Sequence, residues 1–262
     1  MSVQFNKFGY YHKKNFLTIV EKFSLLNLLK NSLSKYMKIK SCNNFEDIKL
    51  HKSLIKFKKN NPKLFGEMYD NLNLNSQLRS IFYRKKFINL FSKLLNTNIN
   101  SIYLNGFMWR IDVPYPIDKR NLLGWHQDGP YYQVCHPKYN SGICAISITN
   151  NTKKNGAVSY IPKSHLNGYY KVNNVKKSNF RQLRKEQFKI KINSTEEKSI
   201  VNPDTNTGDI VCSHLNIKHK GGINKTNKVR MSMLCRFHDM NSTFNSGKEL
   251  YIFNKNKKSN LF

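Results

Sequence analysis

Cysteine is scarce in this sequence, and its placement excludes two of its common uses. The five cysteines are an odd number at irregular spacings, at Cys42, Cys135, Cys144, Cys212 and Cys235. This pattern fits neither a disulfide framework nor a zinc site built from CxxC pairs. We therefore expect reduced thiols with mostly structural roles.

Long apolar runs are also missing. No uninterrupted run approaches the length of about 18 apolar residues that a membrane helix needs, and residues 1–7 lack the apolar core of a secretory signal. We therefore expect a soluble, cytoplasmic protein with no membrane span. With 262 residues, 39% apolar and 13% aromatic, the chain can bury one substantial core but is too short for two large ones. We expect a single domain over residues 1–262.

Acidic residues are few, with 15 Asp and Glu against 45 Lys and Arg, and the formal net charge is +30. A basic surface attracts phosphate without reading sequence, so nucleic acid is one candidate partner. Lysine and asparagine are, however, abundant throughout the chain, including the loop at residues 171–177. We therefore favour a general compositional bias over a focused binding patch, with an anionic substrate or partner as the alternative.

Residues 1–98 are expected to be mainly helical. Between residues 16 and 37 apolar side chains recur at intervals of three and four, and Thr18 and Glu21 have the spacing of a capping box. A second apolar stripe runs over residues 78–95, with basic residues on its polar face. The intervening residues 45–75 show weak periodicity, which favours short helices and loops. These stripes indicate packing onto a core and not a cofactor site.

From residue 99 the pattern changes to that of β-strands, and residues 99–240 are expected to form a β-core. Arg110 lies on an early strand and could either face a pocket or form a salt bridge at the surface. The tail at residues 241–262 is polar apart from a short apolar run at 250–253. The runs that predict strands in the first half of this core are 102–104, 107–113 and 143–148.

The segment at residues 125–130 carries the first chemical signal. Successive side chains of an extended strand alternate faces, so His126 and Asp128 would project to the same side while Gln127 turns away. An imidazole and a carboxylate placed this way supply two corners of the 2-His-1-carboxylate triad, which holds non-haem Fe(II) and leaves three positions open. A tripeptide of this kind also recurs by chance, so a second histidine is required.

The second histidine is sought in residues 208–222, which contain His214 and His219. Their five-residue offset places them on opposite faces of a continuous strand, so only one can point at the metal. A strand ending near His219, a turn, and a strand returning from Lys228 would form a hairpin. In that hairpin His219 and Arg230 would be cross-strand neighbours.

Taken in order, His126, Asp128, His219 and Arg230 resemble the phytanoyl-CoA dioxygenase family of Fe(II)/2-oxoglutarate oxygenases. In that family the distal histidine precedes the arginine by about eleven positions, as His219 precedes Arg230 here. The sequence NGAVSYIPKSH at residues 155–165 resembles a family signature, and GYY at 9–11 with NFL at 15–17 resembles its N-terminal entry. The resemblance in order and spacing extends over about residues 8–240. It also favours His219 over His214.

The resemblance implies an α+β fold with a mainly β core, a double-stranded β-helix (jelly roll, cupin-like) with N-terminal backing helices. It implies Fe(II) held by His126, Asp128 and His219, with 2-oxoglutarate chelating two free positions and O2 entering the third. Succinate and CO2 would be released. Arg230, with Ser232 facing the same way, would bind the C5 carboxylate of 2-oxoglutarate, because a planar guanidinium binds carboxylate with two hydrogen bonds.

Several side chains have open roles. The hydroxyl that family members use for the cosubstrate is unassigned, and Ser147 is a possible substitute or a satisfied core serine. Arg236 is in phase with Arg230 and could line the pocket, bind an acidic substrate or form a buried ion pair. We expect a structural hydrogen bond for His165. Candidate residues of the substrate mouth or of a lid, or of merely connecting segments, are Tyr131, Tyr132, His136, Tyr169, Tyr170 and Phe180.

Hydroxylation of a small-molecule substrate is the function that these signals favour. The presence of Asp128 supports it, because related halogenases lack this carboxylate. Oxidative demethylation of nucleic acid is an alternative, with limited support from Arg230, Arg236 and the positive charge. A jelly-roll binding module with a vestigial triad is a non-enzymatic alternative. The substrate and the oligomeric state do not follow from the sequence.

Overall fold

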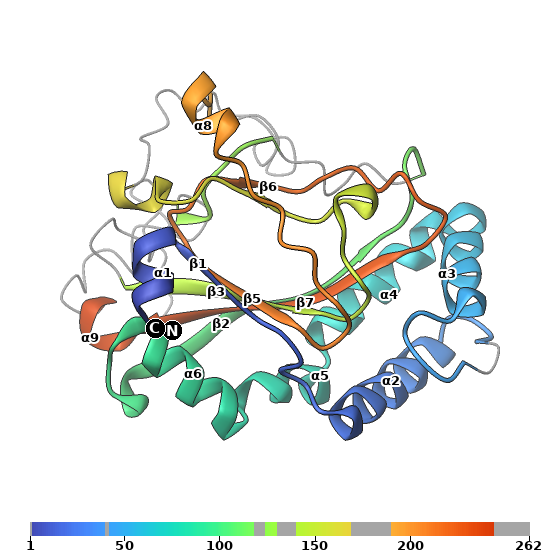
Figure 1. Ribbon diagram of the computed structural model, residues 1–262. Helices are drawn as coiled ribbons and strands as arrows, with labels where there is room; N and C mark the ends of the chain where they lie inside the picture. Colours follow the sequence, from blue (N-terminus) through green and yellow to red (C-terminus); the bar gives the residue numbers. More distant parts are fainter. Residues whose placement is uncertain (1, 40–41, 118–123, 130–139, 169–189, 244–262) are drawn as a thin grey trace, which may run out of the picture.

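The computed structural model describes residues 2–39, 42–117, 124–129, 140–168 and 190–243, and its core consists of two antiparallel β-sheets with helices along one side (Figure 1). The helices of the N-terminal part are α1 (Ser2–Phe8), α2 (Ile19–Ser34), α3 (Ile48–Asn60), α4 (Pro62–Leu74), α5 (Ser76–Ser80) and α6 (Lys85–Leu95), and short helices follow at α8 (Ser194–Lys198) and α9 (Met240–Thr243). The strands are β1 (Tyr10–Lys13), β2 (Ile102–Asp112), β3 (Ser141–Ser147), β4 (Ser159–Tyr160), β5 (Ile210–His214), β6 (His219–Lys220) and β7 (Arg230–Asp239).

The larger sheet has the strand order β1-β5-β3-β7-β2. Every neighbouring pair is antiparallel, and β7 pairs with the edge strand β2 on one side and with the central strand β3 on the other. The pairing of β2 with β7 shifts register between Asn105 and Met108, which is a β-bulge. We call this five-stranded sheet the major sheet.

The smaller sheet is β4 paired with β6, and isolated bridges widen it on both sides. His126 bridges to His219 on one edge of β6, and Val201 bridges to Tyr160 on the far edge of β4. From β2 to β7 the chain thus passes back and forth between the sheets, except that the successive segments at 160 and 201 both lie in the minor sheet. The segments at 126, 160, 201 and 219 belong to the minor sheet and the longer strands to the major sheet. This alternation is the double-stranded β-helix that the sequence predicts. We call this smaller sheet the minor sheet.

One predicted pairing is wrong. His219 and Arg230 are not cross-strand neighbours of a hairpin, because β6 belongs to the minor sheet and β7 to the major sheet. The hydrogen-bonding edges of β6 are already occupied, by Tyr160 on one side and His126 on the other. Residues 221–229 therefore carry the chain across from one sheet to the other.

The helical layer follows the predicted periodicity, with two differences. Thr18 and Glu21 form the predicted capping box at the start of α2. Part of the predicted apolar stripe at the start of α2 is exposed, however, with Ile19 82% and Phe23 59% accessible. Residues 45–75 also form more regular structure than predicted, since α3 and α4 have 13 residues each.

Local end signals explain those two regular helices. Asp47 caps α3 by accepting a hydrogen bond from the Lys49 amide, and Pro62 opens α4, where a missing N–H costs nothing. Figure 1 shows the N-terminal helices along the major sheet, and α4 and α6 contact β2. No helix of the described chain is long and apolar enough to cross a membrane.

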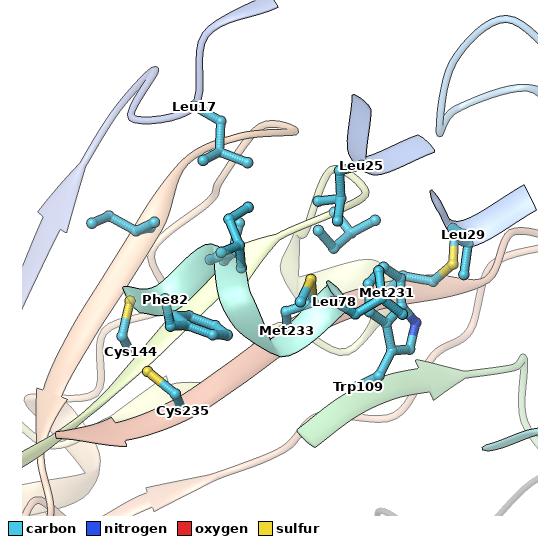
Figure 2. Close-up of a cluster of buried hydrophobic side chains, with 14 of the residues drawn as sticks. Leu17, Leu25, Leu29, Leu78, Phe82, Trp109, Cys144, Met231, Met233 and Cys235 are labelled. Atoms are coloured by element: carbon cyan, nitrogen blue, oxygen red, sulfur yellow. The ribbon is translucent and has the colours of Figure 1, made fainter. Parts of the chain in front are cut away.

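The main core lies between these helices and the major sheet (Figure 2). Alternate residues of β7 face the helices, and they are the apolar ones. Figure 2 shows Met231, Met233 and Cys235 of β7 in one cluster with Phe82 and Leu78 of the helical layer. The remaining alternate residues of β7, which include the arginines, face the opposite side toward the minor sheet. The buried cysteines Cys42, Cys144, Cys212 and Cys235 are free thiols, as expected, and Cys135 lies outside the described residues.

Candidate active site

His126, Asp128 and His219 come together in the space between the two sheets. Asp128 Oδ1 lies 3.9 Å from His126 Nε2 and 3.8 Å from His219 Nε2. One ligand atom from each residue lies within 4.8 Å of the others, and no second cluster of this kind occurs in the described residues. Reciprocal backbone hydrogen bonds of 3.0 and 2.9 Å between His126 and His219 fix the spacing of the two imidazoles.

Both imidazoles are aimed by backbone carbonyls two residues earlier in the chain. His126 Nδ1 lies 2.8 Å from the Gly124 carbonyl oxygen, and His219 Nδ1 lies 3.0 Å from that of Ile217. A carbonyl only accepts, so in the neutral form of each ring Nδ1 carries the proton and Nε2 is the nitrogen with the free lone pair. Supporting hydrogen bonds of this type fix the tautomer and the ring direction of metal-binding histidines.

Burial and charge set the protonation states of His126 and Asp128. Burial, together with the neighbouring His219, lowers the pKa of His126 to about 4. Burial by itself raises the pKa of the Asp128 carboxyl, but the adjacent Arg236 and the two histidines outweigh it, and the net pKa is lowered. At neutral pH, His126 is therefore neutral and Asp128 ionised.

Arg236 of β7 holds the other oxygen of Asp128. Its Nη2 lies 3.3 Å from Asp128 Oδ2, and its Nη1 donates to the Gly106 carbonyl at 2.8 Å. Of the three roles that the sequence leaves open for Arg236, the structure shows the buried ion pair. The side chain is 4% exposed.

His214 does not join this group. Its Nδ1 accepts a hydrogen bond from the Asn216 amide, and its ring lies 5.1 Å from that of His165, centroid to centroid. Burial lowers the pKa of His214 to about 3, so it is a neutral core histidine. His165 Nε2 lies 2.9 Å from the Asn6 carbonyl oxygen, which is the structural hydrogen bond expected for it.

Arg230 lies in the barrel interior on the major sheet and is 4% exposed. Its Nη2 donates to Asp112 Oδ2, from the facing position on β2. Arg110, two residues earlier on β2, has its Nη2 3.9 Å from the other carboxylate oxygen of Asp112. Arg230 Nε is buried and has no hydrogen-bond partner in the described part of the chain. The guanidinium therefore has an unsatisfied donor.

Ser232 and Ser147 are cross-strand partners in the same row of the major sheet, and Arg110 continues that row on the other side of Ser232. The Ser147 hydroxyl lies 2.6 Å from that of Thr205 and accepts from the Asn151 amide at 2.9 Å. This engagement favours the satisfied core serine over a cosubstrate ligand.

Three features of this site were missed in the sequence. Asp112 could have been found, since it is in phase with Arg110 on the predicted strand. Tyr160 lies in the 155–165 signature, faces His219 across the minor sheet and stacks on it with 6.2 Å between centroids. Apart from the presence of a glycine within a predicted strand, nothing in the sequence indicated a role for Gly106. The predicted mouth and lid residues Tyr131, Tyr132, His136, Tyr169, Tyr170 and Phe180 lie outside the described residues.

The residues present fit a divalent metal and a carboxylate ligand. Two imidazole nitrogens and one carboxylate oxygen converge here, which is the donor set that non-haem Fe(II) accepts with open positions left over. The unsatisfied Arg230 Nε fits a carboxylate, because an ionised acceptor would remove the cost of a buried unpaired donor.

Comparisons with solved structures give the same fold at low sequence identity. A non-heme monooxygenase, ThoJ, in its apo form superposes with a TM-score of 0.59 and 18% identity, covering 91% of this chain and 76% of that one. The epimerase SnoN, in complex with Fe3+, alpha ketoglutarate and nogalamycin RO, gives a TM-score of 0.60 and 13% identity over 91% and 82%. EvdO2 from Micromonospora carbonacea var. aurantiaca, complexed with 2-oxoglutarate, gives 0.53 and 14% over 90% and 89%.

No curated protein sequence matches the chain significantly. A family profile does, over residues 5–232, and its description is phytanoyl-CoA dioxygenase (PhyH). The match runs from α1 into β7 and includes the four residues on which the sequence resemblance was based. The chain belongs to the phytanoyl-CoA dioxygenase family and is thus an enzyme of the 2-oxoglutarate-dependent non-haem iron oxygenases, with iron and 2-oxoglutarate as cofactor and cosubstrate.

Proposed function

We propose that this protein is a hydroxylase of a small-molecule substrate, with His126, Asp128 and His219 as the iron ligands. The observation that carries the proposal is the convergence of their ligand atoms within 4.8 Å. Iron held there would support the O2-dependent decarboxylation of 2-oxoglutarate to succinate and CO2, in which one oxygen atom of O2 enters succinate and the other enters the substrate. One catalytic domain over residues 1–262 is part of this proposal.

In this proposal the minor sheet and the Asp128 segment supply the metal site. The carbonyls of Gly124 and Ile217 keep both Nε2 lone pairs directed at one point. Burial keeps competing protons away, because the pKa of His126 is lowered to about 4. His126 therefore needs to release no proton at neutral pH when metal binds.

The major sheet supplies the cosubstrate site. Arg230 presents a guanidinium whose Nε lacks a hydrogen-bond partner within the described chain. The hydrogen bond from its Nη2 to Asp112 fixes the orientation of the guanidinium. We assign Arg230 to the C5 carboxylate of 2-oxoglutarate and Ser232, which faces the same side, to a supporting hydroxyl contact. An arginine in a buried, preoriented position discriminates in favour of a dicarboxylate.

Small-molecule hydroxylation is favoured over nucleic-acid demethylation. Arg236, which gave the latter limited support in the sequence, is engaged by Asp128 and Gly106 inside the protein. The similar structures include an enzyme bound to the small molecule nogalamycin RO. Asp128 occupies its ligand position with a carboxylate, which supports hydroxylation over halogenation. An anionic substrate agrees with the third interior arginine, Arg110, whose positive charge acts on both His126 and Asp128.

The test is an anaerobic titration of the purified protein with Fe(II) and 2-oxoglutarate. We expect the weak visible charge-transfer band of the iron chelate in the wild type and its loss in Asp128→Ala. Arg230→Ala should retain iron but require far more 2-oxoglutarate. No band and no affinity for 2-oxoglutarate in the wild type would refute the assignment. Once the band is seen, succinate release identifies substrates from a panel of neutral and anionic small molecules.

A further inference from the structure

We propose that Arg236 is a positioning residue that holds Asp128 as a one-oxygen metal ligand, and that Gly106 provides the space that Arg236 occupies. The inference rests on the proposed function, in which Asp128 binds the metal. It assigns a role to an arginine, a glycine and a β-bulge that the ligand set alone does not explain.

The two oxygens of Asp128 face different partners. Oδ1 is directed at the imidazoles, 3.9 Å from His126 Nε2 and 3.8 Å from His219 Nε2. Oδ2 is directed at Arg236 Nη2, 3.3 Å away. The backbone of the aspartate is fixed as well, because its amide donates to the Leu215 carbonyl at 3.0 Å. Asp128 is therefore held both at its backbone amide and at its Oδ2.

Arg236 is in turn fixed by the edge of the major sheet. Its Nη1 donates to the Gly106 carbonyl, which lies within the register shift of β2 between Asn105 and Met108. Gly106 has φ +57, a conformation that side chains rarely adopt, and a Cβ placed on it would lie 2.6 Å from Arg236 Nη1. The bulge thus turns a carbonyl toward the guanidinium and leaves no room for a side chain there.

The chemistry explains why one oxygen matters. A carboxylate binds a metal through one oxygen or through both. The triad must leave three positions open, two for 2-oxoglutarate and one for O2. If Oδ2 also bound the metal, one of these positions would be lost. A guanidinium hydrogen-bonded to Oδ2 keeps that oxygen away from the metal and satisfies its charge.

The experiment is a titration of the metal-free full-length protein with cobalt(II) chloride, followed by visible absorption and calorimetry. Cobalt reports coordination number through its absorption without any turnover. The variants are Arg236→Gln, Arg236→Lys, Gly106→Ala and the Arg236→Gln/Gly106→Ala double variant. Leu29→Ala is the matched stability control, because it weakens the helical core on the far side of the major sheet from the site.

For Arg236→Gln we expect a spectrum that indicates added coordination and an affinity for cobalt about 10- to 100-fold weaker, the usual cost of losing a supporting contact. Gly106→Ala should change both in the same direction although Arg236 is still present. Arg236→Lys should restore part of the effect. The double variant should be no worse than Arg236→Gln alone, because both substitutions remove one interaction. Leu29→Ala should lower the melting temperature only.

Wild-type spectra and affinities in both Arg236→Gln and Gly106→Ala, with only lower melting temperatures, would show that Arg236 is merely structural. Tighter cobalt binding in Arg236→Gln would also overturn the inference. If Arg236→Gln does not fold, the cobalt spectra and affinities of Gly106→Ala and Arg236→Lys test the inference instead. Wild-type values in both would overturn it. A wild-type protein that binds neither cobalt nor iron would instead refute the proposed function, and the inference with it.

Discussion

The two sheets place functional groups by different means. In the minor sheet, whose strands are two residues long, the functional groups are imidazoles held by carbonyls two positions earlier in the chain. In the major sheet, β2 and β7 have 11 and 10 residues, and the functional groups are charged. Their partners are distant in sequence, as for Asp112 with Arg230 and Asp128 with Arg236.

This difference separates local from long-range determinants of the site. A histidine oriented by its own chain keeps its direction if the pairing around it shifts slightly. A buried arginine depends on the register of its sheet, because losing its partner leaves a charge unpaired in the interior. Substitutions in the minor sheet should therefore act on metal binding, and those in the major sheet on cosubstrate binding and on stability. Arg236 is the exception, because its side chain contacts the proposed metal ligand Asp128.

The largest effect is expected at His219 in the minor sheet. His219→Ala removes one of three ligands, so metal affinity should fall by more than the roughly 10- to 100-fold that a supporting contact costs, and turnover should be lost. His214→Ala, five residues away, should leave metal affinity within about threefold, because its ring packs on His165. Calorimetry with Fe(II) under anaerobic conditions measures both. The reverse ranking would move the metal site to His214.

Arg230→Gln in the major sheet should have the next largest effect. Removing a buried charge partner costs about 2–5 kcal/mol, which is roughly a 30- to 3,000-fold weaker affinity for 2-oxoglutarate. The affinity for Fe(II) alone should stay unchanged. Arg84→Gln, which breaks a surface pair with Glu21, is the control. Equal losses of iron and 2-oxoglutarate affinity would contradict the assignment of metal binding to the minor sheet and of cosubstrate binding to the major sheet.

Sequence reasoning reached the local part of this site and missed the long-range part. Strand alternation sufficed to bring His126 and Asp128 to one side, and the family resemblance favoured His219 over His214. The premise of one continuous strand through both histidines was wrong, because His214 ends β5 of the major sheet and His219 begins β6 of the minor sheet. The hairpin joining His219 to Arg230 was wrong, because nothing in residues 221–229 indicates that the chain changes sheets. The hydrogen bond from Arg236 to the Gly106 carbonyl depends on a β-bulge at Gly106. The pattern of apolar residues in the sequence does not indicate this bulge.

Acidification should lower the stability of the metal-free protein through a buried histidine of the major sheet. His238, buried in the major sheet, has a pKa lowered to about 3 by burial and by the charge of Arg236. Below pH 6.5 the unfolded chain therefore binds more protons than the folded one. The free energy of unfolding decreases as the pH is lowered, by about 1.4 kcal/mol per pH unit for each such histidine. Denaturant unfolding of the metal-free protein between pH 7 and pH 5 tests this. His238→Gln should reduce the slope by one histidine, and an unchanged slope would contradict it.

The smallest effect is expected for Ser147→Ala. The hydroxyl is engaged by Thr205 and Asn151 within the protein, so its loss should cost stability of about 1 kcal/mol and change the affinity for 2-oxoglutarate by less than about threefold. Ser232→Ala, its cross-strand partner on β7, should weaken cosubstrate binding more, because Ser232 faces the same side as Arg230. Paired titrations of the two variants with 2-oxoglutarate compare them directly. A larger loss in Ser147→Ala would mean that β3, and not β7, supplies the cosubstrate hydroxyl.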